Sequence, residues 1–287
     1  MRQIFRPVKC LFFWTRSSAW IERVASDHQA VGSNPIGSFS LLFIIISCEE
    51  NDIMVKPICI IAARGGSKGV PKKNIRIINS KPLIAHTIIK AKKSKIFSHV
   101  IVTTEDKKIA RIAKQYGAEI PFMRPKKYAT DTASLDDVLV HAIKKLFSLN
   151  YKFKTVVNLD CTVPFLRIKD IVGTVNQLEK TNCNYVVGVY RQHLNPYYNI
   201  VEKNSRGFVK LVKPVKKFYR TRQESPKVYQ LNGLLTFNAK TILNRNTSYS
   251  DLSKTTIYEI PIETGVMIDT EFEFEIASAM FKKWYKI

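Results

Sequence analysis

A basic, glycine-rich segment stands out among the residues that could do chemistry. AARGGSKGVPKKN, residues 62–74, follows an apolar run and contains Arg64, Lys68, Lys72 and Lys73. Glycines let backbone N–H groups approach an anion, and the cations supply charge that suits a triphosphate. The segment matches neither GxxxxGK[ST] nor GxGxxG, the motifs of P-loop and dinucleotide-binding proteins. It indicates a polyphosphate site of another type, or a basic turn that only connects a strand to a helix.

Three further segments carry polar residues beside expected strands or helices. Asp160 ends the apolar run TVVNLD, and open α/β sheets bind ligands at the carboxyl ends of their strands. It could contact sugar hydroxyls or a metal ion, or only cap a turn. Asn232 precedes Gly233, which is also an ordinary turn signal before a strand. Asp131 or Thr132 could start the helix expected after them.

The order of apolar runs predicts the elements that must position these residues. From Met54 onward, short apolar runs alternate with longer amphipathic ones, beginning PICIIAA, LIAHTIIKAKK, HVIVTT and KKIARIAKQYG. Strands that alternate with helices of this length indicate an α/β fold with a mostly parallel sheet covered on both faces. The expected continuation is a short strand near Ile120, a helix over 135–147, a strand at 155–160, a helix over 168–179 and a strand at 185–190. The order of the strands within the sheet does not follow from this pattern.

The regular pattern breaks between Asn195 and Lys227. This stretch is rich in Pro, Lys, Arg and Tyr and has weak periodicity, which indicates an excursion from the sheet. We expect an extended arm inserted at about 195–227, of a kind that serves a neighbouring subunit in a homodimer. The chain then returns with LLTF and TIYEIPI, and a final helix is expected over 271–284.

Together these segments resemble the CMP-N-acetylneuraminic acid synthetase (acylneuraminate cytidylyltransferase) family of sugar nucleotidyltransferases. The family's loop has the form ARxxSKGxPxKN, which this chain matches at Arg64, Ser67, Lys68, Gly69, Pro71, Lys73 and Asn74. Later segments match in order at Arg124, Ser134, Thr162, Pro164, Arg167, Arg222, Gln223, Pro226, Tyr229, Asn232 and Gly233. The resemblance covers nearly all of 54–287 and implies a Rossmann-like, glycosyltransferase-A-like nucleotidyltransferase fold.

The resemblance also implies a role for each matching residue. Arg64 and Lys73 would hold the CTP phosphates and form the catalytic set with Asp269. The residues implied at the nucleotide are Ser67, Lys68, Asn74, Arg124 and Ser134. Those implied at the acceptor sugar are Asp160, Arg222 and Asn232. The guanidinium of Arg222 suits the carboxylate of that sugar because it donates a bidentate pair of hydrogen bonds.

The last segment, MIDTEFEFE, departs from the family's DIDTxxD. In the family, two aspartates two residues apart on an extended segment point the same way and hold Mg²⁺. Here Asp269 is present, but its partner is Met267, which cannot ligate magnesium. Asp160 replaces the family's glutamine and could supply the missing ligand, since related sugar cytidylyltransferases take a metal ligand from that strand end. We therefore expect Mg²⁺ as cofactor at Asp269 and Asp160; alternatively Asp269 acts with waters and phosphates, the protein is catalytically weak, or Asp269 only caps the last helix.

The composition limits the classes of partner that the protein is expected to bind. Lys and Arg number 46 against 23 Asp and Glu, a formal net charge of +23, which suits nucleic acid, an acidic membrane or an anionic small substrate. The charge is scattered, and no DNA- or RNA-binding signature accompanies it, so we expect no nucleic acid and no membrane partner. The five Cys stand singly without metal-ligand spacing, as in a reduced, cytoplasmic protein.

Residues 1–53 differ from the remainder. Their basic and acidic residues balance, so the whole excess charge lies after them. The apolar run SLLFIIISC is shorter than a spanning helix of about 20 residues and lies too far from the start for an ordinary signal peptide. TRSSAWIERVASDHQAVGSNPIG resembles the conceptual translation of a transfer-RNA gene. We expect a mis-started, non-native extension before a cytidylyltransferase domain at 54–287; the alternative is a targeting or anchoring extension.

The sequence thus predicts an enzyme that joins CMP from CTP to a sialic-acid-like nonulosonic acid, releasing pyrophosphate, for surface glycan synthesis. One alternative is a 3-deoxy-octulosonate cytidylyltransferase, although RQESPKVYQLNG matches the sialic-acid branch better. Another is a module that binds a nucleotide but lost catalysis through Met267. No residue is singled out as a general base.

Overall fold

The computed structural model describes residues 55–216, 218–244 and 254–284. All of them belong to the unit Met54–Ile287. The expectation for residues 1–53 lies outside the described residues. Within the described part, no helix is both long and apolar enough to cross a bilayer.

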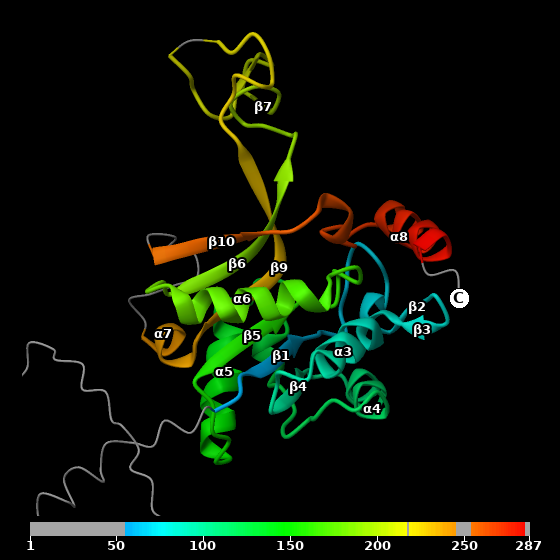
Figure 1. Ribbon diagram of the computed structural model, residues 1–287. Coiled ribbons are helices and arrows are strands. Elements are labelled where there is room, and N and C mark those ends of the chain that lie inside the picture. Colours follow the sequence, from blue (N-terminus) through cyan, green and yellow to red (C-terminus); the bar gives the residue numbers. More distant parts are fainter. Residues whose placement is uncertain (1–54, 217, 245–253, 285–287) are drawn as a thin grey trace, which may run out of the picture. The chain divides into compact units, whose positions relative to one another are not determined.

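A six-stranded sheet in the order β10-β6-β9-β5-β1-β4 forms the centre of this unit (Figure 1). Its strands are β1 (Ile58–Ala62), β4 (His99–Thr103), β5 (Thr155–Leu159), β6 (Tyr185–Gln192), β9 (Val228–Asn238) and β10 (Thr255–Glu259). Strand β9 runs antiparallel to both of its neighbours, whereas the other paired strands are parallel. The prediction of a mostly parallel α/β sheet is therefore confirmed.

Helices cover both faces of the sheet, as the continuous apolar runs of its strands require. Cys59 and Ile61 of β1 pack with α3 (Leu83–Ser94), α4 (Lys107–Gln115) and α6 (Ile168–Lys180). Ile58 and Ile60 point to the opposite face and pack with α5 (Leu135–Ser148) and α7 (Ala239–Leu243). This alternation follows from the two-residue period of a strand. The expected helices over 135–147 and 168–179 are confirmed to within one residue at their ends.

The last helix, α8 (Glu271–Trp284), begins with a capping box. Thr270 Oγ1 accepts from the N–H of Glu273, whose carboxylate accepts from the N–H groups of Asp269 and Thr270. The alternative that the Asp269 side chain caps this helix is wrong. Three apolar residues of α8 pack against β2, α3 and the two loops around the site; the cluster comprises Val70, Ile78, Leu83, Phe165, Ile268, Phe274, Ala277 and Phe281.

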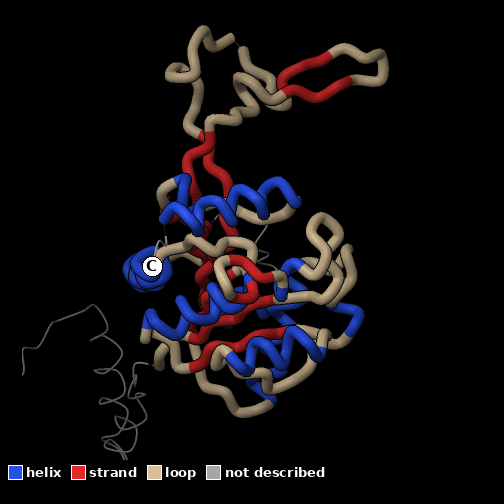
Figure 2. The backbone as a smooth tube through the Cα atoms, turned by 90° about the vertical axis from the view of Figure 1, so that its right-hand side faces the viewer, coloured by secondary structure: helices blue, strands red, loops and turns tan. Residues whose placement is uncertain are grey.

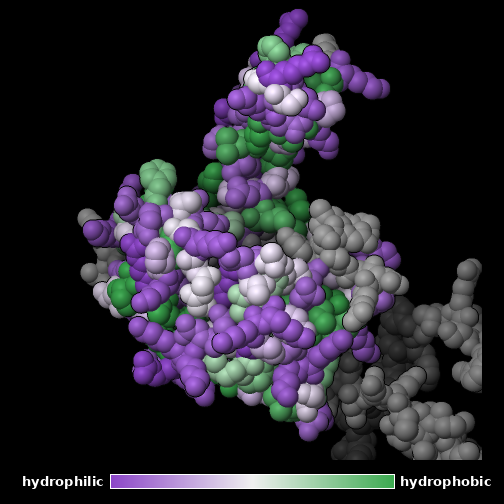
Figure 3. All heavy atoms as spheres, turned by 180° about the vertical axis from the view of Figure 1, so that it is seen from behind, coloured by the Kyte–Doolittle hydropathy of each residue, from purple (hydrophilic) through white to green (hydrophobic). Residues whose placement is uncertain are grey.

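The stretch between β6 and β9 leaves the sheet, as predicted. Within it, β7 (Val201–Lys203) and β8 (Val209–Leu211) form an antiparallel hairpin that projects beyond the ends of β6 and β9 (Figure 2). At its base the buried Asn195 donates to Ser225 Oγ and Pro226 O, which ties the two ends of the arm together. Figure 3 shows hydrophobic side chains gathered along this arm, and Phe208 and Phe218 are 70% and 78% exposed.

One expected strand is absent from the described part of the chain. Near Ile120 there is only an isolated bridge, between Ile101 and Glu119. Pro121 follows, and its lack of an N–H prevents it from extending the ladder. The remaining short elements are β2 (Ile77–Ile78), β3 (Lys81–Pro82) and the 3₁₀ turns η1 (Lys73–Ile75), η2 (Lys126–Tyr128) and η4 (Ile262–Thr264).

Candidate active site

A cavity of about 480 Å³ opens at the carboxyl ends of β1 and β5. It is the position at which open α/β sheets bind ligands. Four segments far apart in the sequence contribute to its lining, namely the loops after β1 and β5, the segment before α5 and the segment before α8. The predicted site residues that line it are Arg64, Ser67, Lys68, Lys73, Asn74, Arg124, Asp160 and Asp269.

The loop after β1 is held in shape by its own side chains and by a close approach to the segment before α8. Asn74 Nδ2 donates to Arg64 O at 2.9 Å, which closes the loop on itself. A Cβ atom at Gly69 would lie 2.0 Å from the carbonyl oxygen of Asp269. Only glycine therefore permits this contact, which brings the loop against the residue expected to bind metal.

An ion pair joins the loop after β1 to the segment before α8. Lys73 Nζ lies 2.7 Å from Asp269 Oδ1 and 2.8 Å from Ile268 O. The Lys73 side chain is mostly buried, with 14% of its surface exposed, whereas Asp269 is more than half exposed. An ammonium has three protons to donate, so one remains for a ligand in the cavity.

Asp160 lies at the end of β5, half-buried at the bottom of the same cavity. Its Oδ1 accepts from Asn158 Nδ2 at 3.1 Å. Burial raises the pKa of Asp160 to about 6, and the negative charge of Asp269 raises it as well, against the lowering effects of Asn158 and Lys73. The electrostatic effect of Asp269 supports the expectation that the two carboxylates lie near each other.

Met267 faces the cavity together with Asp269, while Ile268 between them is buried in the cluster around α8. This is the alternation expected of an extended segment. The N–H of Ile268 donates to Thr162 O at 2.9 Å, so the segment is tied to the loop after Asp160. The side chain at position 267 therefore points toward the site, as it would if it were an aspartate.

Two cations of the loop, Arg64 and Lys68, are paired with an acid at the rim. Arg64 Nη1 lies 2.9 Å from Asp131 Oδ1, and Lys68 Nζ lies 2.6 Å from Asp131 Oδ2. The expectation that Asp131 or Thr132 starts α5 is wrong. Ser134 is the cap, since its Oγ accepts from the N–H of Asp137 at 3.1 Å.

Glu105 is a site residue that the sequence analysis missed. Its Oε1 accepts from the N–H of Gly65 and its Oε2 from Arg124 Nη2, both at 2.7 Å. Arg124 Nη2 also donates to Ala63 O at 3.0 Å, and the Arg124 side chain is 3% exposed. Arg124 is one of the residues that line the cavity, and within the described residues its buried Nε has no hydrogen-bond partner. The signal was an acidic residue two positions after the strand HVIVT, where a side chain reaches the ligand edge of the sheet.

Comparison with known proteins decides the family. A family model described as Cytidylyltransferase matches residues 58–276, which is most of the chain and includes every segment that lines the cavity. The chain belongs to the cytidylyltransferase family. It is accordingly a nucleotidyltransferase, and the resemblance drawn from its motifs is confirmed.

Named relatives match this cytidylyltransferase over nearly their whole length. It is 35% identical to post-translational flagellin modification protein B of Campylobacter coli, over 80% of this chain and 97% of the relative. It is also 35% identical to CMP-N,N'-diacetyllegionaminic acid synthase of Campylobacter jejuni, over 78% of this chain and 94% of the relative. The fold resembles that of a CMP:2-keto-3-deoxy-manno-octonic acid synthetase solved with CTP, with a TM-score of 0.61 and 19% identity over 79% of this chain and 99% of the other.

The carboxylates of the cytidylyltransferase fit a hard divalent cation. Mg²⁺ binds oxygen ligands and is commonly held by one or two carboxylates together with waters and substrate phosphates. Asp160 and Asp269 face one cavity, and a cation between two carboxylates would offset the repulsion of their negative charges. No group of three or more His, Cys, Asp or Glu side chains in the described ranges could hold a metal alone. The pair would therefore hold Mg²⁺ only with waters and phosphates.

Three predicted residues of the cytidylyltransferase do not line the site cavity. Ser134 caps α5 behind it, although its neighbours Ala133 and Leu135 both line it. Arg222 lines a second cavity, of about 380 Å³, at the base of the arm. Asn232 is fully buried within β9, where its Oδ1 accepts from the N–H of Leu234.

The Asn-Gly pair is part of a strand rather than a turn. Gly233 lies within β9 and has a φ of +76°, which favours glycine. A Cβ atom at Gly233 would lie 2.4 Å from Asp160 Oδ2. The carbonyl oxygen of Gly233 accepts from the N–H of Asp160 at 3.1 Å. The pair thus shapes the backbone against which Asp160 is placed.

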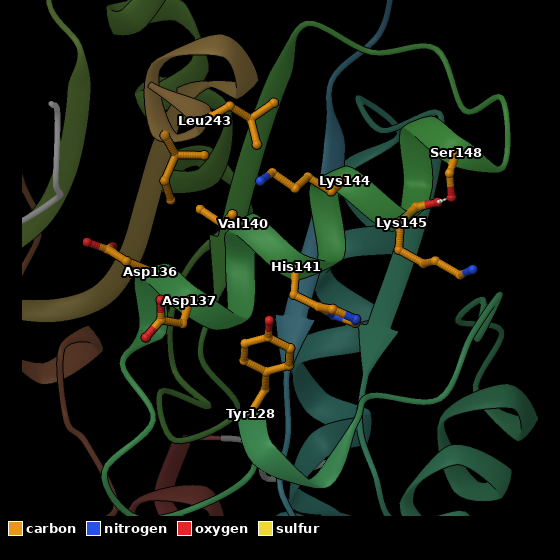
Figure 4. Close-up of a pocket in the computed structure, with 10 residues that line it drawn as sticks. Tyr128, Asp136, Asp137, Val140, His141, Lys144, Lys145, Ser148 and Leu243 are labelled. Atoms are coloured by element: carbon orange, nitrogen blue, oxygen red, sulfur yellow. Dashed lines mark hydrogen bonds between the residues drawn. The ribbon is translucent and has the colours of Figure 1, made fainter. Parts of the chain in front are cut away.

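A larger cavity lies elsewhere. It has a volume of about 730 Å³ and runs along the outer side of α5, between Tyr128, His141, Lys144 and Leu243 (Figure 4). It shares only Tyr128 with the site cavity and contains none of the loop cations. The candidate active site is therefore chosen by the convergence of charged side chains and not by cavity volume.

Proposed function

We propose that the protein transfers CMP from CTP to a nonulosonic acid and releases pyrophosphate. The observation that carries this proposal is the pairing of Lys73 with Asp269 in a cavity that also holds Asp160, Arg64 and Lys68. Cations for a polyphosphate and carboxylates for a divalent cation then face one another, as phosphoryl transfer requires. The relative named for N,N'-diacetyllegionaminic acid supports the acceptor class, and the relative named for flagellin modification supports a role in surface glycan synthesis.

The nucleotide would bind with its phosphates at the loop after β1. Arg64, Lys68 and Lys73 neutralise the phosphate oxygens, and the free N–H groups of the glycine-rich loop add donors. Arg124, held by Glu105 and Ala63, would place its positive charge beside the rest of the nucleotide. Asn74 and Ser67 complete this side of the cavity, with Ser134 at its edge.

In the transfer step, the anomeric hydroxyl oxygen of the acceptor attacks the α-phosphorus of CTP, and the hydroxyl proton is lost to water. The bond from that phosphorus to the bridging oxygen breaks, and its electron pair leaves with pyrophosphate. Lys73 and Arg64 stabilise the charge that develops on the phosphate oxygens, and Lys73 needs little reorganisation because Ile268 O and Asp269 already fix its ammonium. Mg²⁺, held by Asp160 and Asp269, would supply further charge neutralisation on the phosphates.

The acceptor carboxylate would bind Arg222. Arg191 and His193 line the same second cavity, so further basic side chains lie near Arg222. We further propose that the arm forms a homodimer, because its exposed apolar side chains Phe208, Val209 and Phe218 suit a protein partner. We also propose that the reaction takes place in the cytoplasm and that residues 54–287 form the catalytic domain.

The test is direct product analysis. The protein is incubated with CTP, Mg²⁺ and a panel of N-acetylneuraminic, legionaminic, pseudaminic and 3-deoxy-octulosonic acids, and CMP-sugar and pyrophosphate are measured. We expect turnover with one of the nine-carbon acids. Preference for 3-deoxy-octulosonic acid would contradict the acceptor class, and CTP binding without turnover on any acceptor would identify a non-catalytic module.

A further inference from the structure

One carboxylate pairs with two cations of the loop after β1. Asp131 accepts from Arg64 at 2.9 Å through one oxygen and from Lys68 at 2.6 Å through the other. Arg64 Nη1 also donates to Thr130 O at 3.0 Å. Residues 129–133 are thereby connected to the loop after β1 across the rim of the cavity that all of them line or flank.

The fold does not require Asp131 at this position for the helix that follows. Ser134 supplies the cap of α5, and Asp136 and Asp137 supply negative charge in its first turn. The Lys68 ammonium, followed by the Arg64 guanidinium, lowers the pKa of Asp131, so the carboxylate is ionised at neutral pH. Its side chain is 44% exposed and that of Lys68 is 81% exposed, so water can replace either partner easily.

We propose that Asp131 is an internal anion that stands in for a phosphate group in the free protein and is displaced when a polyphosphate binds. A carboxylate and a phosphate oxygen accept the same N–H bonds from Arg and Lys. A triphosphate carries several negative charges and so prevails over a single carboxylate. Each binding event must nevertheless break two ion pairs, which lowers the affinity and speeds the release of pyrophosphate. This inference rests on the proposed function for the identity of the polyphosphate.

The opposite role is a definite alternative. Asp131 could instead hold Arg64 and Lys68 in the orientation that a ligand needs, as Glu105 holds Arg124. Removing its charge would then weaken polyphosphate binding. The two roles predict effects of opposite sign, so a single substitution separates them.

The experiment measures binding without turnover. Inorganic tripolyphosphate is titrated into wild-type protein and into Asp131→Asn by isothermal calorimetry, with no acceptor sugar present. Because exposed ion pairs are individually weak, we expect Asp131→Asn to bind about two- to fivefold more tightly. The gain should shrink at high salt, since exposed charges are screened there. Pyrophosphate should show the same trend and uncharged cytidine should show none.

The matched control is Glu275→Gln. It removes the same charge from an exposed position on α8, away from the cavity. If it raises tripolyphosphate affinity as much as Asp131→Asn does, net charge is the cause and the inference is wrong. Unchanged or weaker binding by a folded Asp131→Asn variant, or absence of tripolyphosphate binding by both proteins, also overturns it. Failure of the wild-type protein to form any CMP-sugar would contradict the proposed function and leave this binding result standing.

Discussion

Lys73 and Asp269 are 196 positions apart in the chain, yet the lysine Nζ lies 2.7 Å from Oδ1 of the aspartate. The contact joins the first loop of the domain to the segment before its last helix. It places a cation for phosphate next to a carboxylate for a divalent cation, and Gly69 allows the two backbones to meet there. Substitutions on either side should therefore affect catalysis more than stability.

Lys73→Met should lower kcat/KM for CTP by about 100-fold or more, because it removes a fixed donor aimed at charge that develops in the transition state. Lys93→Met, on the exposed side of α3, is the matched control and should leave kcat/KM unchanged. Steady-state kinetics with pyrophosphate detection would measure both. A loss of less than fivefold in Lys73→Met would remove this residue from the catalytic set.

Asp160→Asn should abolish most of the activity if Asp160 compensates for Met267 at the Mg²⁺ site. Met267→Asp in that background should partly restore it, since position 267 faces the same cavity. A double-mutant cycle on activity and on Mg²⁺ dependence should show strong coupling, because both positions would serve one ion. Near wild-type activity of Asp160→Asn with unchanged Mg²⁺ dependence would leave Asp269 as the sole metal carboxylate.

Glu105→Gln should raise KM for CTP by about tenfold and change kcat less, because a buried guanidinium loses its charged partner while the shape is kept. Glu119→Gln provides the comparison, since Glu119 pairs with His99 at the opposite end of β4. Equal effects of both variants on CTP binding would show that Glu105 acts only on stability. Thermal unfolding of both variants would complete the test.

Arg222→Ala should raise KM for the acceptor sugar by roughly ten- to 100-fold and leave KM for CTP unchanged, as expected for a lost charged hydrogen bond. Arg220→Ala, an exposed arginine of the same arm, should affect neither constant. Initial rates with each substrate varied in turn would distinguish them. A rise in KM for CTP alone would refute the assignment of Arg222 to the sugar.

Removal of residues 1–53 should leave a fully active protein, because the family match begins at residue 58 and the cavity is built from later residues. The comparison is kcat/KM of the chain 54–287 against that of the full chain. Native protein is expected to start at Met54, and intact mass from the source cell tests this. A native mass that includes residues 1–53 would contradict the second expectation.

Local patterns in the sequence were sufficient for much of this result. The alternation of apolar runs predicted the helices except the short α7, and it predicted most strands because burial on both faces of a parallel sheet demands continuous apolar strands. The loop 62–74 indicated a polyphosphate site because glycine N–H groups and cations suit an anion, and this stays a prediction. Met267 and Asp269 were correctly expected on one side, since residues two apart in an extended segment share a face.

Only the tertiary structure decided which charges meet. The antiparallel insertion of β9 between β5 and β6 brings Gly233 against Asp160, and local periodicity contains no information on strand order. Asp131 lay where a helix cap was expected, but it pairs with Arg64 and Lys68 because the fold brings two loops together at the rim. In the sequence, Glu105 is an ordinary acidic residue after a strand. The fold brings the N–H of Gly65 to one of its carboxylate oxygens and Arg124 Nη2 to the other. Such contacts depend on through-space distance, which the sheet topology sets and the spacing along the chain does not.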